Sequence, residues 1–253
     1  EVLWELGAEV IEIGNNPDGF NINLGCGSMH PKLAAEAVLR EKADLGICLD
    51  GDADRVVLID EKGCEVNGDQ IMAAIADLWK KNGRLRGRGV VATVMSNLGF
   101  ERYLNEMGLE LKRTQVGDRY VVEEMKRLNF NLGGEQSGHI VMTDYMTTGD
   151  GLVAALQFLQ ALLVGERPAS ELLNKFEPYP QVIRNIGYSG SIDFLETDTI
   201  KKIVIDSERK LGRDGRLLIR KSGTEPLLRI MVEHPNEVLI QEIVKKIANA
   251  IKC

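Results

Sequence analysis

The sequence predicts an α/β protein whose layered mixed sheets are followed by a small α+β domain with an antiparallel sheet. Between residues 68 and 175, predicted strands alternate with amphipathic helices, the pattern of a sheet with helices on its faces. The segment Glu177–Pro180 carries two prolines, which stop a helix and favour an extended connection. After this segment the order becomes strand, helix, strand, strand and helix, which indicates a separate domain.

Length and composition describe an ordinary globular chain. Its 253 residues are enough for two or three small domains, and 44% hydrophobic with 27% charged residues is a common balance. The formal net charge of −7 argues against nucleic acid as a partner, because nucleic-acid binding needs a basic face. No apolar run is long enough to cross a bilayer, so we expect no membrane partner. The four cysteines lack metal-ligand or redox spacing, which suits a reducing cytoplasm.

The first 67 residues predict two helices separated by a strand, and then a pair of strands. Glu1–Gly7 is typical of the end of an amphipathic helix, and the apolar residues after it predict a strand at Glu9–Ile13. A second helix begins near Pro31, because proline suits the first helical turn. Strands are expected at 45–49 and 56–60. The chain starts inside a helix–strand unit without an initiating Met, so we expect its parent protein to be longer.

The remaining elements follow from hydrophobic periodicity and from Gly and Pro breaks. In the middle region we expect helix 69–81, strand 89–95, helix 97–107, strand 109–115, helix 118–128, a glycine-rich hairpin at 130–143 and helix 150–164. Beyond the proline-containing linker we expect strand 181–188, helix 197–211, strands 216–220 and 227–233, and helix 236–251.

The segment Asp50-Gly51-Asp52-Ala53-Asp54-Arg55 is the most informative part of the chain. It follows the apolar strand 45–49, and three carboxylates this close repel each other unless a cation neutralises them. Hard oxygen ligands suit Mg²⁺, which usually accompanies phosphate chemistry. An arginine beside three aspartates is best explained by an anionic substrate that shares the site. The loop therefore predicts a metal-assisted phosphoryl enzyme.

Two simpler interpretations of this loop fit less well. A polar turn between strands explains one Asp-Gly pair, but not three alternating aspartates. In a calcium loop of the EF-hand type that starts at Asp50, the sixth position has to be glycine, and Arg55 stands there. The flanking segments also predict strands rather than helices, so we exclude the EF-hand.

A second candidate is the glycine-rich segment Gly133–His139. Its glycines let the backbone approach a ligand closely. Glu135, Gln136 and Ser137 offer acceptors and donors of the kind that bind sugar hydroxyls or an amine. The imidazole of His139 could transfer a proton near neutral pH. A hairpin turn with incidental polar residues is the alternative.

Two further segments suit an anion. Arg220–Pro226, with Arg229 beyond it, joins two apolar strands and combines cationic side chains, hydroxyls and glycine N–H groups, as a phosphate cradle does. A charged hairpin loop on a solvated edge is the alternative. Gln115–Tyr120 lies at a strand-to-helix junction, where a helix N-terminus near Arg119 favours an anion. Taken alone, this junction is better explained by Asp118 as an ordinary helix cap.

These motifs, in this order, resemble the α-D-phosphohexomutase superfamily. The metal loop of that family reads Asp-Gly-Asp-Gly/Ala-Asp-Arg and matches residues 50–55. Its sugar-recognition loop reads Gly-Glu-x-Ser-Gly-His and matches 134–139, and its phosphate loop matches 220–226. The resemblance runs over essentially the whole chain.

Within the superfamily, three features are similar to the branch that acts on glucosamine phosphates. They are Gln136, the segment Val116–Val121 and the segment Thr147–Gly151. Members that act on mannose or glucose phosphates tend to carry Met in place of Gln136, and Gly-His in place of Gly117-Asp118. The resemblance therefore implies an isomerase that interconverts glucosamine 6-phosphate and glucosamine 1-phosphate.

The resemblance also implies a domain plan. Residues 1–67 would be the C-terminal part of the second of four domains, 68–176 the third and 181–253 the fourth. The family's first domain carries a phosphorylated serine in a Thr-Ala-Ser-His-Asn-Pro-like loop, and this sequence contains no such segment. The expectation is thus a C-terminal portion of a longer enzyme, inactive by itself.

Site roles follow from the same resemblance. One Mg²⁺ would be held by Asp50, Asp52 and Asp54. Arg55 would steady the transferring phosphoryl group, and His139 is the second catalytic candidate, for proton transfer or for contact with the substrate. The other assignments are Glu135, Gln136 and Ser137 for the sugar, Arg220, Ser222, Gly223, Thr224 and Arg229 for the phosphate that is not transferred, and Gly117, Asp118 and Arg119 as a further substrate or phosphate loop. The partner would be a hexosamine phosphate, converted through glucosamine 1,6-bisphosphate.

Two alternatives stay open. One keeps the superfamily and changes the sugar to mannose or glucose phosphate. The other is a non-catalytic module that binds sugar phosphate or Mg²⁺.

Overall fold

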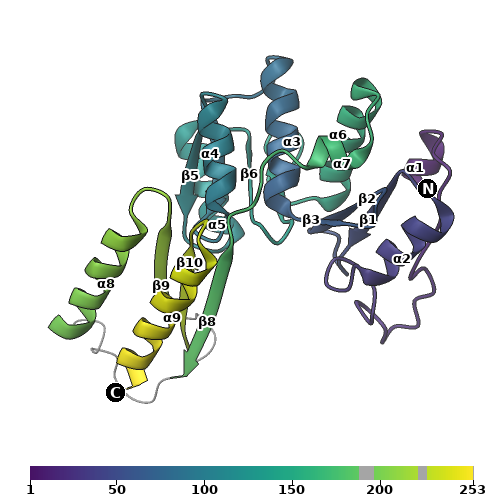
Figure 1. The fold of residues 1–253 in the computed structure, drawn as a ribbon. Helices are drawn as coiled ribbons and strands as arrows, with labels where there is room; N and C mark the ends of the chain where they lie inside the picture. The colour runs from purple at the N-terminus through teal and green to yellow at the C-terminus, as the bar shows by residue number, and fades with distance from the viewer. Residues whose placement is uncertain (188–196, 222–226, 253) are drawn as a thin grey trace. The chain divides into compact units, whose positions relative to one another are not determined.

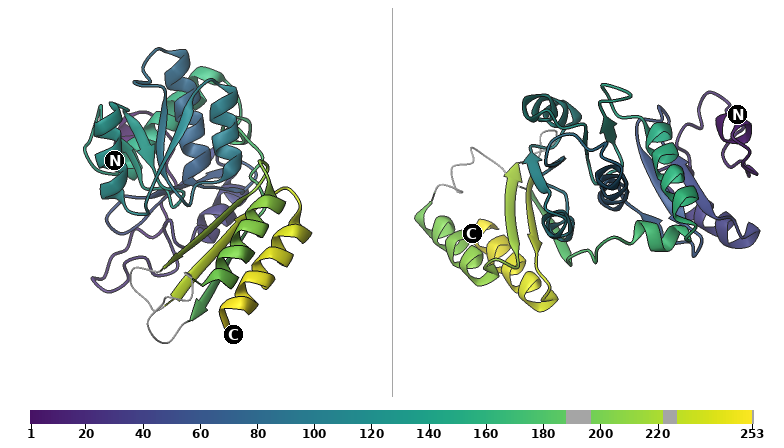
Figure 2. Two further views of the ribbon diagram at one scale, coloured as in Figure 1. Left: turned by 90° about the vertical axis from the view of Figure 1, so that its left-hand side faces the viewer. Right: turned by 90° about the horizontal axis from the view of Figure 1, so that it is seen from above.

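The computed structural model describes residues 1–187, 197–221 and 227–252. These residues form two compact units. Unit 1 comprises residues 1–96 and 103–176, and unit 2 comprises 97–102 and 177–253. Figure 1 shows the order of the elements along the chain, and Figure 2 gives two further views.

Unit 1 begins with a small antiparallel sheet of order β1-β2-β3. Its strands are β1 (Leu45–Leu49), β2 (Val56–Asp60) and β3 (Glu65–Val66), and the helices before them are α1 (Val2–Glu5) and α2 (Lys32–Glu41). Helix α2 packs Val38 against Cys48 of β1 and Ile59 of β2, which buries its apolar face. Pro31 stands at the start of α2, as the sequence predicted.

The strand predicted at Glu9–Ile13 is wrong. This segment is irregular, and no described strand pairs with it. Its apolar side chains Val10, Ile11 and Ile13 are between 38% and 47% exposed. A strand needs a neighbouring ladder to satisfy its backbone N–H and C=O groups, and apolar composition alone does not supply one.

The second sheet of unit 1 is mixed, with the order β5-β4-β6-β7. Strand β4 (Gly89–Thr93) is parallel to β5 (Glu110–Thr114) and to β6 (Leu132–Gly134), whereas β7 (Ile140–Met142) is antiparallel to β6. The helices of unit 1 after β3 are α3 (Gly68–Lys81), α5 (Asp118–Leu128), α6 (Gly151–Gly165) and the short α7 (Ala169–Leu173). Helix α4 (Leu98–Glu106) is divided between the units, because its residues up to 102 belong to unit 2. Helices α3 and α6 contact strands of both sheets, so they hold unit 1 together (Figure 1).

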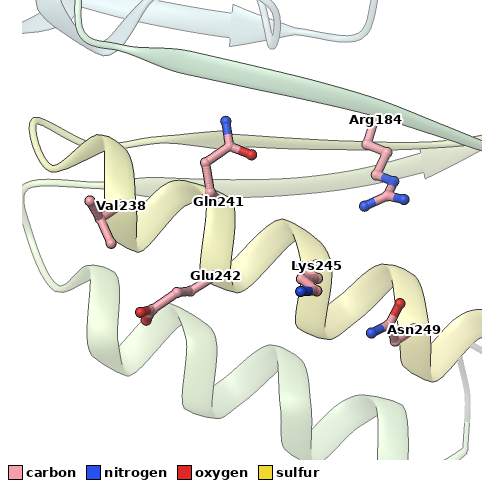
Figure 3. A pocket seen from close by; sticks show the side chains of 6 residues that line it. All are labelled: Arg184, Val238, Gln241, Glu242, Lys245 and Asn249. Carbon is pink, nitrogen blue, oxygen red and sulfur yellow. The ribbon is translucent and has the colours of Figure 1, made fainter.

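Unit 2 contains an antiparallel sheet of order β8-β10-β9. Its elements are β8 (Gln181–Gly187), α8 (Asp198–Leu211), β9 (Arg216–Lys221), β10 (Leu227–Glu233) and α9 (Glu237–Lys252). A surface pocket of about 360 Å³ lies between β8 and α9 (Figure 3). It is lined by Arg184, Val238, Gln241, Glu242, Lys245 and Asn249.

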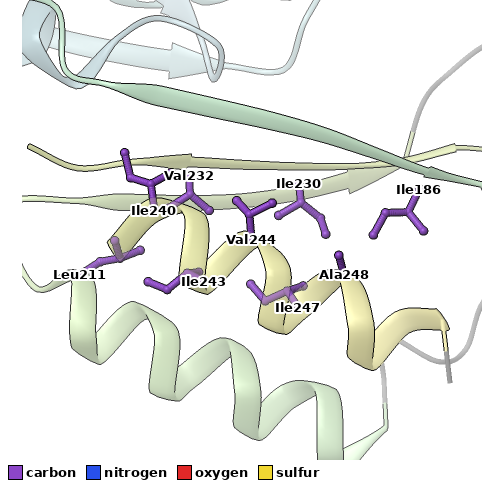
Figure 4. Packing of buried hydrophobic residues seen from close by; sticks show 9 residues of the cluster. All are labelled: Ile186, Leu211, Ile230, Val232, Ile240, Ile243, Val244, Ile247 and Ala248. Carbon is purple, nitrogen blue, oxygen red and sulfur yellow. The ribbon is translucent and has the colours of Figure 1, made fainter. Parts of the chain in front are cut away.

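The core of unit 2 forms where α8 and α9 cover the sheet (Figure 4). Its buried residues are all aliphatic and come from two strands and both helices: Ile186, Leu211, Ile230, Val232, Ile240, Ile243, Val244, Ile247 and Ala248. Beside this core, the fully buried carboxylate of Glu233 accepts hydrogen bonds from Arg216 Nε and from Gln181 Nε2, both at 2.7 Å. Glu233 therefore links β10 to both of its neighbouring strands.

The predicted fold class is confirmed: mixed α/β layers precede an antiparallel α+β unit. The sequence missed the two-residue strand β3 and the short helix α7, which are too brief for a periodic pattern. The domain limits 1–67, 68–176 and 181–253 stay a prediction. Among the described residues, no helix combines the length and apolar character needed to cross a bilayer.

An ion-pair cluster anchors the end of unit 1 to helix α3. The carboxylate of Asp77 lies 2.8 Å from Lys175 Nζ and 3.0 Å from Lys81 Nζ, and the Asp77 and Lys175 side chains are only 14% and 16% exposed. Burial by itself raises the pKa of Asp77, but hydrogen bonds from Lys175 and Lys81 outweigh it and lower the pKa below its ordinary value.

We predict that Asp77→Asn destabilises the protein by about 2 kcal/mol at pH 7, because the two lysines lose a charged acceptor. Since the pKa of Asp77 is lowered by folding, its contribution is present above the unfolded-state pKa and disappears as the pH falls through the folded-state value. The difference between variant and wild type should therefore shrink below about pH 4 in urea unfolding. Asp206→Asn, which removes a surface pair with Arg209, is the control and should change little. A pH-independent loss in Asp77→Asn would contradict this account.

Candidate functional site

The acidic loop 50–55 is the hairpin connection between β1 and β2. The side chain of Asp50 accepts a hydrogen bond from the backbone N–H of Arg55 at 3.0 Å, and its carbonyl accepts one from Ala53 at the same distance. Ala53 has a φ of 59°, which turns the chain within the loop. These bonds fold the loop back on itself and bring its three aspartates together.

The three aspartates can face one point. One carboxylate oxygen each from Asp50, Asp52 and Asp54 can be chosen so that all lie within 4.8 Å of one another. Arg55 Nε lies 3.7 Å from Asp50 Oδ2 and 3.8 Å from Asp54 Oδ1. One guanidinium cannot balance three carboxylates, so the cluster keeps a net negative charge that a divalent cation would neutralise.

The environment of the Asp54 carboxylate indicates whether these residues fit a cation. Burial raises its pKa above the ordinary value, and the neighbouring Asp50 raises it further. Its Oδ1 atom is buried and makes no hydrogen bond within the described part of the chain, which is costly for a carboxylate. A metal ion would supply the missing partner, and an all-oxygen donor set suits Mg²⁺. The residues present therefore fit a divalent cation.

The glycine-rich loop between β6 and β7 is a tight turn. The Glu135 N–H donates to the His139 carbonyl at 2.9 Å, and the Gly138 N–H donates to the Glu135 carbonyl at 3.0 Å. The Glu135 side chain accepts from the backbone N–H of Gly117 at 2.9 Å and from Ser137 Oγ at 3.3 Å. The hairpin predicted from the glycines is confirmed, and its polar side chains interact with each other.

The acidic loop and the glycine-rich loop touch through their backbones. Arg55 and His139 form an antiparallel bridge, and the Val56 N–H donates to the Gly138 carbonyl at 3.1 Å. A Cβ at Gly138 would lie 2.1 Å from the Val56 carbonyl oxygen, so only glycine permits this approach. The same contact brings His139 Nδ1 to 3.0 Å from Asp54 Oδ2, although the two residues are 85 positions apart.

Two helices start against these loops. The first N–H of α3, from Gly68, donates to the Gln136 carbonyl at 3.0 Å, and Gln136 Nε2 donates to Asp69 Oδ2 at 3.3 Å. The first N–H of α6, from Gly151, donates to the Ala53 carbonyl at 2.9 Å. Sequence reasoning did not assign Gly68, Asp69 or Gly151 to the site. The signal available was their position at a helix start next to a motif.

The junction at Gly117–Arg119 reaches the site through its backbone. Gly117 donates its N–H to Glu135, as described above, and α5 begins at the next residue. The Arg119 side chain is 80% exposed and pairs with Glu123 at 2.8 Å, so it points to its own helix rather than to the loops. The N-cap prediction for Asp118 is wrong, because Gly117 is the N-cap of α5 and makes no side-chain cap hydrogen bond. Asp118 is the first helical residue, and its side chain accepts only from the adjacent Arg119 N–H at 2.7 Å among the bonds described.

The predicted phosphate residues belong to unit 2. Arg220 on β9 stands directly opposite Arg229 on β10. Burial lowers the pKa of Arg220, and the positive charge of Arg229 lowers it further. Like charges that face each other across a sheet are unfavourable, and a bound anion would relieve this repulsion. Ser222, Gly223 and Thr224 lie outside the described residues. The pocket of Figure 3 is lined by none of the predicted site residues.

Comparison with known proteins gives one consistent result. The family model described as phosphoglucomutase/phosphomannomutase, alpha/beta/alpha domain III, matches residues 67–179, and the model of the C-terminal domain matches 185–250. The phosphoglucosamine mutase of Cereibacter sphaeroides is 58% identical over 252 residues, which cover 100% of this chain. The chain spans 56% of the length of that relative.

Solved structures share the fold at lower identity. A phosphoglucomutase/phosphomannomutase family protein from Burkholderia thailandensis aligns with a TM-score of 0.72 and 20% identity, over 89% of this chain and 50% of that one. The Aspergillus fumigatus N-acetylphosphoglucosamine mutase, solved with GlcNAc-6P and magnesium, aligns with a TM-score of 0.69 and 22% identity, over 93% of this chain and 54% of that one.

We predict that Gly68→Ala destabilises the protein by roughly 1–3 kcal/mol, because its Cβ would lie 2.2 Å from the Glu135 carbonyl oxygen and push α3 away from the glycine-rich loop. Gly165→Ala is a matched control at the end of α6, where the Cβ would meet Leu172 at an ordinary 3.4 Å. The control should be neutral or stabilising by up to about 1 kcal/mol. Urea unfolding of both variants measures the difference, and equal effects would refute the tight contact at Gly68.

Proposed function

The chain belongs to the phosphoglucomutase/phosphomannomutase family, and on this premise we propose that it functions as a phosphoglucosamine mutase. The reaction would interconvert glucosamine 6-phosphate and glucosamine 1-phosphate through glucosamine 1,6-bisphosphate. The observation that carries the proposal is the contact between the three-aspartate loop and the glycine-rich loop, because it brings a candidate cation site next to the loop proposed to bind the sugar. The identity of 58% to a phosphoglucosamine mutase supports the choice of sugar.

We propose that Asp50, Asp52 and Asp54 hold one Mg²⁺. Support comes from the buried Oδ1 of Asp54, which makes no hydrogen bond within the described residues, and from the fold shared with an N-acetylphosphoglucosamine mutase solved with magnesium. When bound, the ion would offset the negative charge that develops on the oxygens of a transferring phosphoryl group. Arg55, whose guanidinium already lies beside two of these carboxylates, would hold the same group from the protein side.

The glycine-rich loop is the proposed sugar site. Ser137 Oγ donates to Glu135 at 3.3 Å, so a sugar hydroxyl that entered between them could donate to the Glu135 carboxylate and accept from the Ser137 hydroxyl, keeping both groups paired. The backbone N–H of Gly117 keeps the other oxygen of Glu135 fixed. The Gln136 amide is bonded to Asp69, which suggests that Gln136 shapes the loop as well as contacting the sugar.

We propose that unit 2 binds the phosphate that is not transferred. Arg220 and Arg229 would supply the charge, with Ser222, Gly223 and Thr224 from the connecting loop, and the junction Gly117–Arg119 in unit 1 would serve as a further phosphate or substrate contact. A fixed distal phosphate aligns the reacting end of the sugar and helps to exclude water.

The domain plan and the cellular location belong to the same proposal. Residues 1–67 would close the second domain of the family, 68–176 would form the third and 181–253 the fourth. The family-model matches at 67–179 and 185–250 support the last two limits. Cysteines without redox spacing favour the cytoplasm.

Substrate preference tests the function. The gene product, as the cell makes it, should convert glucosamine 6-phosphate faster than mannose 6-phosphate or glucose 6-phosphate when Mg²⁺ is present. A clear preference for mannose or glucose 6-phosphate would support the other activities of the family instead. Binding of hexose phosphates with no turnover of any of them would favour a non-catalytic module.

Metal titration tests the cation site on the 253-residue chain. Mn²⁺ is a paramagnetic substitute for Mg²⁺, and its binding can be followed by electron paramagnetic resonance. Asp52→Asn should weaken Mn²⁺ binding roughly tenfold or more, because it removes one charged oxygen ligand. Asp44→Asn, an exposed aspartate that precedes β1, is the control and should leave binding unchanged. Equal affinities in all three proteins would refute the site.

A further inference from the structure

We propose that His139 is a positioning residue whose Nδ1–H holds the carboxylate of Asp54 in the orientation that binds the metal. This inference rests on the metal site proposed above. It replaces the proton transfer that the sequence suggested for His139.

The first argument is the hydrogen bond itself. His139 Nδ1 lies 3.0 Å from Asp54 Oδ2. An ionised carboxylate can only accept, so the shared proton belongs to Nδ1 and the imidazole is the donor. The bond occupies one oxygen of Asp54 and leaves the buried Oδ1 for a cation. Hydrogen bonds of this kind fix metal-ligating carboxylates and are part of most metal sites.

The second argument is that the other ring nitrogen is covered. His139 is only 5% exposed, and its Nε2 atom is buried without a hydrogen-bond partner in the described chain. A Cβ at Gly149 would lie 2.4 Å from Nε2 and 2.5 Å from Cε1, so the Gly149 backbone lies directly against this edge of the ring. A general acid or base has to present a nitrogen to the substrate, and this ring presents none.

The third argument is that backbone pairing fixes both His139 and Gly149, the residue that covers the ring. His139 forms a bridge with Arg55, next to Asp54, and Gly149 forms a bridge with Val141 of β7. The imidazole is thus held between the acidic loop and the segment that precedes α6. A carboxylate bonded to such a ring has little freedom to rotate away from the metal.

Two amide substitutions separate the nitrogens of the ring. The amide nitrogen of His139→Asn falls near the position of Nδ1, whereas that of His139→Gln falls near Nε2. We expect His139→Asn to keep most of the Mn²⁺ affinity, and His139→Gln and His139→Ala to lose about 10–100-fold. The 253-residue chain is titrated with Mn²⁺ by electron paramagnetic resonance, and far-ultraviolet circular dichroism checks that each variant folds. If His139→Ala does not fold, the comparison of Asn with Gln decides alone.

The outcomes distinguish this inference from the metal site on which it rests. If wild type binds Mn²⁺ and Asp52→Asn weakens it, but His139→Gln binds as tightly as wild type, the positioning role is overturned and the site stands. If wild type does not bind Mn²⁺, both are overturned. A proton-transfer role predicts a different pattern, in which Asn and Gln lower kcat of the gene product equally and leave Mn²⁺ affinity unchanged.

Discussion

The candidate site depends on one backbone contact, the pairing of Arg55 and Val56 with Gly138 and His139. The acidic loop belongs to one sheet and the glycine-rich loop to another, and this contact is where the two meet. It exists because residue 138 has no side chain, and it is supported by α3 and α6, whose first N–H groups bond to the two loops. The close contact of the two backbones also brings the His139 imidazole to Asp54.

Much of this arrangement could be predicted from local sequence. Alternating aspartates between two apolar runs predict a hairpin whose carboxylates cluster, and closely spaced glycines predict a tight turn. Features that depend on distant partners could not be predicted. Glu9–Ile13 has the composition of a strand but lacks a neighbour among the described strands, and the burial of His139 results from Gly149, which the sequence gives no reason to place against the ring. Arg119 was predicted to contact an anion, but its guanidinium forms an ion pair with Glu123, one helical turn further along α5.

The acidic net charge of the chain makes the positions of its cationic side chains important for any anionic ligand. With a formal net charge of −7, this chain would not attract an anion over long range, and salt screens charges beyond about 10 Å. An anion would therefore be attracted only at close range, by groups such as Arg55 in unit 1 and the facing Arg220 and Arg229 in unit 2.

The buried Glu233 has a consequence for those two arginines. Its carboxylate meets Arg216 across the β9–β10 ladder, four positions from the point where Arg220 meets Arg229. Sliding either strand by a single residue would leave this charge enclosed without its guanidinium, at a cost of several kcal/mol. The Arg216–Glu233 ion pair therefore selects the one strand register in which Arg220 stands opposite Arg229.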